Sequence, residues 1–222
     1  TNHSACVIVT RTRPQFNIQA SAYPTAGGTV SGYGQYLLGQ YVTLTATSAT
    51  GYDFVNWTEN GNVVSTSSTY QFEAEANRNL VANFSIRSFT ITATASPVAG
   101  GTVSGSGTYN YGTTVNMSAT ANTGYTFSAW KENNSQVSAN ANYSFTATQS
   151  RNLTAEFTLN SYTVTVLANN NSWGSVTGGG TYNYGEQVTI TATANPNFEF
   201  VGWADGNQNA SRTITVEGDA TY

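Results

Sequence analysis

The sequence predicts an all-β protein built from three tandem copies of one small domain, and three observations lead to this prediction. Trp57, Trp130 and Trp203 follow one another at intervals of 73 residues. Several segments alternate apolar and polar residues with the period of two that is typical of a half-buried strand. The 222 residues are rich in Thr, Ser, Asn, Gly and aromatic residues, and only 8% of them are charged. A period of this length has to be found first, because missing it gives the wrong fold.

The repeat extends well beyond the tryptophan. GGTVSG occurs at 27–32 and 100–105, and WGSVTG takes the same place at 173–178. The segments NRNLVANF (77–84) and SRNLTAEF (150–157) close the first two copies. The domain boundaries predicted from this alignment are an N-terminal strand (1–13), repeat 1 (14–86), repeat 2 (87–159) and repeat 3 (160–222) with an incomplete closing strand. The N-terminal strand is interpreted as the remnant of a preceding repeat.

Short strands account for most of each repeat. FTITATA (89–95), VTITATA (188–194) and LTAEF (153–157) each place their apolar residues on one face. The breaks between them, such as VAGGTVSGSG and ADGNQ, are rich in the Gly and Asn residues that turns require. We therefore expect about five strands in each repeat, connected by hairpins, and no helix.

The recurring aromatic residues are predicted to form the core. In GYTFSAW, Tyr125 and Phe127 share one strand face, whereas Trp130 follows at an odd offset that requires a β-bulge. A domain of 73 residues has few large apolar groups to bury. The predicted core residues are Trp57, Trp130, Trp203, Tyr125, Phe127, Phe84 and Phe157. The alternative is that the tryptophans form exposed platforms for sugar rings.

Charge and hydropathy exclude several classes of partner. The net charge is −4 and the chain has one lysine, so no basic surface is predicted for nucleic acid or an anionic membrane. No apolar run is long enough to span a bilayer. The single cysteine, Cys6, excludes a disulfide framework. No signal segment opens the chain, and between a cytosolic protein and a mature piece of an exported one the composition favours the latter.

No catalytic, cofactor or metal site is predicted. His3 is the only histidine, which argues against a Ser-His-Asp triad or a histidine metal site. Glu59, Glu132 and Asp205 each lie two residues after a tryptophan and are interpreted as the start of a tight turn. Asp205-Gly-Asn207-Gln-Asn209 resembles a calcium loop, but the glycine and the bidentate glutamate that such a loop needs are missing.

Arg78 and Arg151 stand at the same place beside the two closing strands. We interpret them as solvated charges at a sheet edge, where they would discourage the pairing of strands between molecules.

These motifs resemble the divergent InlB-type B repeat, a relative of the Listeria–Bacteroides repeat. The marks of the resemblance are Tyr109 and Tyr111-Gly112, then Gly124-Tyr125-Thr-Phe127 with Trp130, and finally Leu153-Thr-Ala155-Glu-Phe157. The resemblance implies β-grasp-like domains in bacterial surface proteins that act as stalks or adhesion modules, with no catalytic residues to transfer. Trp173 in place of a Gly, Leu38 in place of the second Tyr, and the incomplete third copy depart from the pattern.

Two functions remain. Four residues separate Phe84 from Phe89 and Phe157 from Tyr162, so neighbouring repeats should touch and form a stiff rod. This favours an extracellular or cell-surface stalk or adhesion element whose partner is a surface protein or glycan. The alternative is a glycan-binding module of a larger secreted enzyme, with contacts from Trp173, Tyr33 and Tyr41, the aromatic residues that break the repeat pattern.

The N-terminal segment supports one further hypothesis. Residues 4–10 are apolar enough to form a strand, whereas repeat 3 lacks the second half of its closing strand. Residues 4–10 of one molecule could therefore add to the open sheet edge of repeat 3 in the next, a head-to-tail association that would repeat into a filament.

Overall fold

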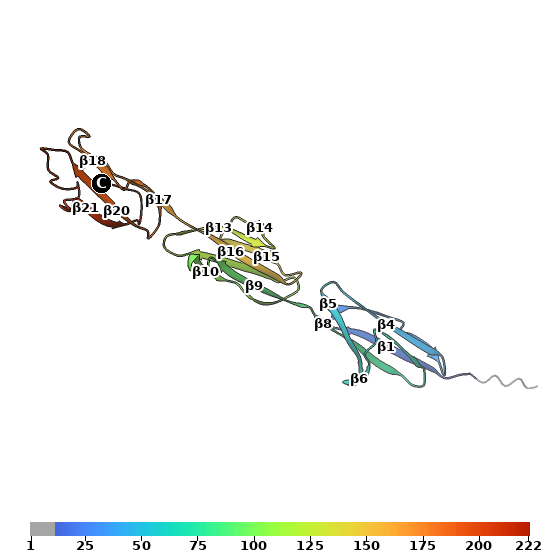
Figure 1. The fold of residues 1–222 in the computed structure, drawn as a ribbon. Helices are drawn as coiled ribbons and strands as arrows, with labels where there is room; N and C mark the ends of the chain where they lie inside the picture. Colours follow the sequence, from blue (N-terminus) through green and yellow to red (C-terminus); the bar gives the residue numbers. More distant parts are fainter. Residues whose placement is uncertain (1–11) are drawn as a thin grey trace, which may run out of the picture. The chain divides into compact units, whose positions relative to one another are not determined.

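The computed structural model describes residues 12–222, and its elements recur with the sequence repeat (Figure 1). Within this part of the chain all regular structure is β-strand except two 3₁₀ turns, η1 (Thr25–Gly27) and η2 (Val98–Gly100). None of the described helices has the length and apolar character needed to cross a membrane. The predicted class, an all-β chain of three tandem repeats, is therefore confirmed.

Repeats 1 and 2 have the same eight strands. In repeat 1 these are β1 (Gln15–Tyr23), β2 (Gly28–Ser31), β3 (Gly34–Leu37), β4 (Tyr41–Ser48), β5 (Tyr52–Glu59), β6 (Asn62–Ser65), β7 (Thr69–Glu73) and β8 (Arg78–Ile86). In repeat 2 they are β9 (Ser88–Ser96), β10 (Gly101–Ser104), β11 (Gly107–Asn110), β12 (Thr114–Ala121), β13 (Tyr125–Glu132), β14 (Ser135–Ser138), β15 (Asn142–Thr146) and β16 (Arg151–Leu159).

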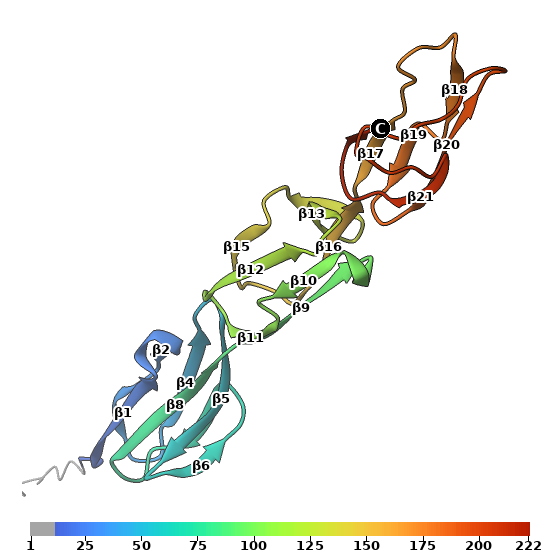
Figure 2. The same ribbon diagram turned by 90° about the vertical axis from the view of Figure 1, so that its left-hand side faces the viewer.

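Each of these repeats folds into two sheets that enclose its core. The five-stranded sheets have the orders β3-β1-β8-β5-β6 and β11-β9-β16-β13-β14, and the three-stranded sheets have the orders β2-β4-β7 and β10-β12-β15. The closing strand lies in the centre of the larger sheet, parallel to the opening strand and antiparallel to β5 or β13. Figure 2 shows β9 and β16 side by side in this arrangement. The closing strand therefore connects the two halves of the larger sheet.

Repeat 3 has fewer strands in the described residues. They are β17 (Ser161–Thr165), β18 (Gly174–Thr177), β19 (Gly180–Asn183), β20 (Gln187–Ala194), β21 (Ser211–Thr215) and β22 (Ala220–Thr221). They form two three-stranded sheets, β19-β17-β22 and β18-β20-β21. Residues 198–203, which correspond to β13, have no strand structure. A strand forms when its backbone groups pair, and the strand that pairs with β13 in repeat 2 is the closing strand.

The expectation of about five strands in each repeat was wrong. The Gly-rich segments that we predicted as turns contain two further short strands in each repeat, such as β10 and β11 in repeat 2. Four-residue strands between glycines lack the longer alternating pattern by which strands are identified in a sequence.

A β-bulge directs the conserved-spacing tryptophan into the core. The pairing of β13 with β16 shifts register between Phe127 and Ala129, and the pairing of β5 with β8 shifts between Phe54 and Asn56. After the shift Trp130 lies opposite Ala155 and is fully buried. The bulge expected from the odd offset of Trp130 is therefore present, and it recurs in repeat 1.

The described chain divides into two compact units. The first consists of repeat 1 up to Phe89 with two segments of repeat 2, Tyr109–Thr113 and Thr146–Gln149, and the second consists of the rest of repeat 2 with repeat 3. Each repeat nevertheless encloses apolar residues of its own. In repeat 1 they come from both sheets and include Ile18, Leu44, Trp57 and Leu80, and in repeat 3 they include Ile190 and Trp203.

Candidate functional site

The three tryptophans are core residues with occupied indole groups. Trp57 and Trp130 are fully buried and Trp203 is 7% exposed. Their Nε1 atoms donate hydrogen bonds to the carbonyl oxygens of Ser68, Ala141 and Asn209, at 3.3, 3.0 and 2.8 Å. Phe84 and Phe157 are also buried, whereas Tyr125 and Phe127 are partly buried. The tryptophan rings therefore present no stacking face to a sugar.

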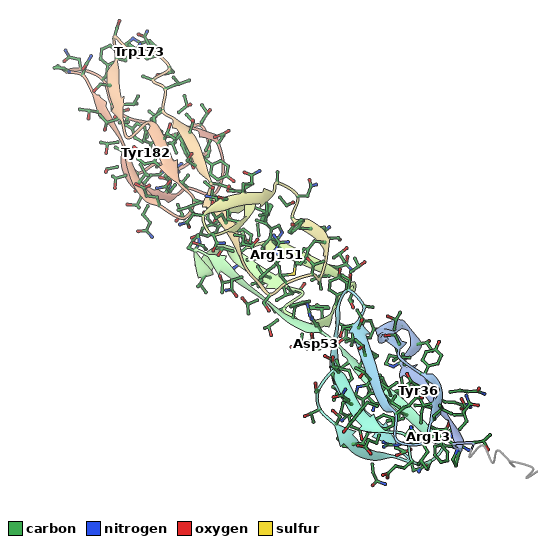
Figure 3. All side chains as sticks on the ribbon, turned by 90° about the vertical axis from the view of Figure 1, so that its right-hand side faces the viewer. Arg13, Tyr36, Asp53, Arg151, Trp173 and Tyr182 are labelled. Carbon is green, nitrogen blue, oxygen red and sulfur yellow. The ribbon has the colours of Figure 1, made fainter. Side chains whose placement is uncertain are left out.

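An arginine–glutamate pair recurs beside each of the first two tryptophans. The Arg151 Nη2 atom lies 2.7 Å from Glu132 Oε2, and the Arg78–Glu59 pair has the same distance. The Arg151 guanidinium also lies over the Phe145 ring, 4.3 Å from its centroid. Figure 3 shows Arg151 among the side chains in the middle of repeat 2. Our interpretation of Arg78 and Arg151 as solvated edge charges was therefore wrong.

These arginines are partly buried because each has a complete set of partners. Their side chains are only 19% and 13% exposed. Hydrogen bonds from Arg78 hold the pKa of the Glu59 carboxyl below its ordinary value, and the same bonds raise the pKa of Arg78. The sequence contained both residues but did not indicate that the fold would bring them together across 19 positions.

The turns predicted after the tryptophans are present. Asn60 and Gly61 have φ angles of 49° and 81°, which are those of a tight hairpin turn between β5 and β6. In repeat 3 the side chain of Asp205 accepts a hydrogen bond from the backbone N–H of Asn207, and Asn207 does the same for Asn209. The oxygens suggested by the calcium-like pattern therefore serve the backbone of a turn.

Repeat 3 obtains its ion pair from a different strand. Asp205 pairs with Arg212 of β21, and the Arg212 guanidinium lies 4.9 Å from the centroid of the Tyr222 ring. Hydrogen bonding from Arg212 lowers the pKa of Asp205. The contact between a carboxylate and an arginine beside the tryptophan is thus retained although the arginine has moved in the sequence.

A single residue connects each closing strand to the next opening strand. Arg87 lies between β8 and β9, and its N–H donates to the carbonyl of Gly51 while its carbonyl accepts from the N–H of Tyr111, both at 2.8 Å. Asn160 makes the equivalent two bonds between β16 and β17, with Gly124 and Tyr184. The backbone of each connecting residue is therefore held on both sides.

A tyrosine ring packs directly against a glycine at each of these positions. A Cβ atom on Gly51 would lie 2.1 Å from the Tyr111 ring, and one on Gly124 would lie 2.1 Å from the Tyr184 ring. Both glycines have a φ of 82°, a conformation that favours glycine. Gly51 and Tyr111 belong to the first compact unit, and Gly124 and Tyr184 to the second. We call this contact the Tyr–Gly seat.

The polar contact next to the seat differs between the two positions. In the first, Arg87 forms an ion pair of 2.7 Å with Asp53, and both side chains are about half exposed. In the second, Thr126 donates a hydrogen bond of 2.7 Å to Asn160. Sequence reasoning missed the seat, although the signal was present: the glycine before GYDF and GYTF is 60 residues away from the second tyrosine of YNYG.

Two outer positions lack the seat. Leu38 corresponds to the seat tyrosines and is 43% exposed, and its N–H donates to the carbonyl of Pro14 as Tyr111 does to Arg87. Asn197 corresponds to the seat glycines and keeps the positive φ, at 69°, but carries a side chain. The sequence departure at Leu38 therefore falls on a surface position.

The residues predicted as glycan contacts are exposed but lie on separate elements. Tyr33 is 57% and Tyr41 is 64% exposed in repeat 1, and the Tyr41 hydroxyl is hydrogen bonded to Glu73, which raises the pKa of the tyrosine. Trp173 is 46% exposed at one end of repeat 3 (Figure 3). Its ring stacks on Phe198 with a centroid distance of 5.8 Å and an angle of 18°.

A cavity of about 480 Å³ opens beside Trp173. Its walls come from the end of the opening strand (167–170), from Trp173 and Gly174, from residues 198–204, and from Tyr222. Among these, Leu167 and Val201 are 63% and 78% exposed. The cavity is the main concave, apolar feature of repeat 3.

The described residues contain no cluster of three metal-ligating side chains. His3, Cys6 and the segment 4–10 that we predicted to associate with repeat 3 lie outside the described residues, as does most of the predicted strand 1–13.

Comparison with known proteins agrees with the repeat. The family model of the divergent InlB B-repeat domain matches residues 18–88, 91–161 and 162–221. No curated protein matches the chain. Among solved structures, the Bacillus anthracis TIE protein is similar with 10% sequence identity and a TM-score of 0.45, over 93% of this chain and 49% of that one. The chain thus spans about half the length of that structure.

Proposed function

The chain belongs to the family of divergent InlB B-repeat domains, and from the way its repeats are connected we propose that it is a non-catalytic bacterial cell-surface or extracellular module. Its role is that of a stalk and adhesion element. The family resemblance supports the surface location, since such repeats are typical of bacterial surface proteins. The partner in this proposal is a protein or glycan at the cell surface.

The Tyr–Gly seat is the observation that most supports a stalk. A connection of one residue leaves little slack, and both backbone groups of that residue are hydrogen bonded. A tyrosine ring against a glycine adds a contact that any bending would have to break. Few charges and no basic cluster make nucleic acid and membrane insertion poor alternatives.

Small-angle X-ray scattering of the whole chain tests the stalk. We expect a narrow distribution of end-to-end distances in the unchanged protein. The double variant Gly51→Ala/Gly124→Ala should broaden it, because each new methyl group would overlap a tyrosine ring. The matched control is Gly39→Ala/Gly61→Ala, whose glycines have nearly the same φ, 81°, and open space at the Cβ position.

The comparison between the two double variants separates the seat from backbone strain. Both place alanine at positive φ twice, so both lose similar stability from that cause. If the unchanged protein already shows a broad distance distribution, the stalk proposal is wrong. If the two double variants broaden it equally, the seat does not restrict the connection.

Glycan binding is a second candidate because of Trp173. Its exposed ring borders an apolar cavity, and an aromatic face of this kind can stack on a sugar. In this case soluble glycans would quench tryptophan fluorescence, and the response would disappear in Trp173→Ala. Quenching that persists in this variant would argue against Trp173 as the contact.

We also propose head-to-tail association through residues 4–10, supported by the open cavity of repeat 3. Sedimentation of the chain with and without residues 1–12 tests it. Polymers that grow with concentration and disappear on truncation are expected, and a monomer in both cases would exclude the filament.

A further inference from the structure

The cavity of repeat 3 coincides with the place of a closing strand. In repeat 2, Ala155 of the closing strand pairs with Ala95 and with Trp130, and Phe157 pairs with Phe127. Adding the 73-residue period gives the corresponding residues of repeat 3, which are Ala168, Trp203 and Phe200. All three line the cavity. The cavity walls are therefore the two neighbours that a closing strand would have.

The backbone of repeat 3 is prepared for such a strand on one side. Val164 pairs in parallel with Ala220, and Thr165 with Thr221, in the register that Ile91 and Arg151 begin in repeat 2. The pairing ends with the bonds between Tyr222 and residues 165 and 167. In repeat 2 the same ladder continues for three further pairs, from Thr94–Thr154 to Ser96–Glu156.

Trp173 occupies a position at which repeats 1 and 2 require glycine. A Cβ atom on Gly100 would lie 2.6 Å from the Cβ atom of Phe157, and the same holds for Gly27 and Phe84. A tryptophan there and a phenylalanine at the end of a closing strand therefore exclude each other in these positions. In repeat 3 the Trp173 ring stacks on Phe198 instead.

We propose that repeat 3 is a strand acceptor, and that its cavity binds an extended segment of another polypeptide chain. The segment runs parallel to β17 and antiparallel to residues 198–203. It carries a small residue opposite Trp203 and a large apolar residue two positions later, the pattern of Ala155 and Phe157. Trp173 covers the second position and must leave Phe198 when the segment binds.

Repeats 1 and 2 identify the occupant. In both, the apolar space between the opening strand and β5 or β13 is filled by a strand with the pattern Leu-x-Ala-x-Phe (80–84 and 153–157). Backbone pairing supplies much of the affinity in this mode of recognition, and side-chain pockets at alternate positions supply the specificity. The proposal does not depend on whether residues 4–10 supply the segment, nor on the stalk function.

The test uses a labelled peptide with the sequence of residues 151–159, RNLTAEFTL, and the full 222-residue chain. Fluorescence anisotropy measures binding, and tryptophan emission reports the movement of Trp173. We expect binding that is lost when lysine replaces the alanine and the phenylalanine of the peptide. Ala168→Glu should abolish binding by placing a charge in the cavity, whereas Val98→Glu, on an exposed residue of repeat 2, should leave it unchanged.

Trp173→Gly separates this proposal from a site that uses the ring as a contact. Removing the ring clears the position of the phenylalanine, so we expect the peptide to bind about tenfold more tightly. Loss of affinity in Trp173→Gly would overturn the proposal, since it would show that the aromatic face itself binds. So would equal binding of the lysine peptide, or the absence of binding to both the unchanged chain and Trp173→Gly.

Discussion

At the scale of single residues, the buried tryptophan contributes most to each repeat. Trp130 has no exposed surface and its indole N–H is bonded to Ala141. We expect Trp130→Ala to lower the free energy of unfolding of repeat 2 by about 3 to 5 kcal/mol, the usual cost of emptying an aromatic site in a core. Urea unfolding measures this. Trp173→Ala serves as the control, and a loss below about 1 kcal/mol in Trp130→Ala would contradict the buried role.

A second prediction at this scale concerns acid stability. The pKa of Glu59 lies below its ordinary value in the folded protein because Arg78 donates hydrogen bonds to the carboxylate. The folded state therefore binds a proton less readily than the unfolded state. The stabilisation is present above the ordinary pKa of 4.5 and is lost as the pH falls through the lower folded value.

Glu59→Gln should accordingly be less stable at neutral pH and should lose less stability on acidification to about pH 3. The measurement is urea unfolding as a function of pH. Glu75→Gln, which changes an exposed glutamate of the same repeat, is the control. Parallel pH profiles for Glu59→Gln and the unchanged protein would show that the ion pair does not couple to stability.

At the scale of elements, the closing strand decides whether its neighbours are strands. Residues 125–132 form β13 against β16, whereas residues 198–203 of repeat 3 have no partner strand among the described residues. We expect amide hydrogens to exchange much faster in 198–203 than in 125–130, because unpaired N–H groups are open to water. Mass spectrometry resolves the two segments, and β20 provides a protected reference within repeat 3. Equal protection of both segments would contradict this account.

At the scale of the whole molecule, the repeats differ in the completeness of their cores. Stability in a repeat array is close to a sum of repeat and nearest-neighbour contributions, so the weakest repeat unfolds first. Repeat 3 has an open cavity where repeats 1 and 2 bury a phenylalanine. We expect urea unfolding in more than one step, with Trp203 reporting the first step and Trp57 a later one.

Variants that retain a single tryptophan make this assignment. Tyr184→Ala should shift the first step to lower urea by removing the Tyr–Gly seat of repeat 3, while the step reported by Trp57 stays in place. A single cooperative transition for all three tryptophans would show that the chain unfolds as one unit.

The sequence alone determined the repeat, its period and the all-β class, because these depend on local patterns. Alternating Thr and apolar residues specify half-buried strands, and the odd spacing of Trp130 required the bulge that β13 contains. The four-residue strands were missed because four residues between glycines do not establish a period.

Only the tertiary structure decided which residues meet. The Arg151–Glu132 pair spans 19 residues and the Tyr111–Gly51 contact spans 60, and no local pattern specifies such contacts. The meaning of Trp173 likewise depended on the partner of its counterpart, because Gly100 is needed only where Phe157 packs against it. Long-range packing and backbone pairing select these contacts, so a charge or a glycine that looks like surface decoration in the sequence becomes part of a buried pair or a seat in the fold.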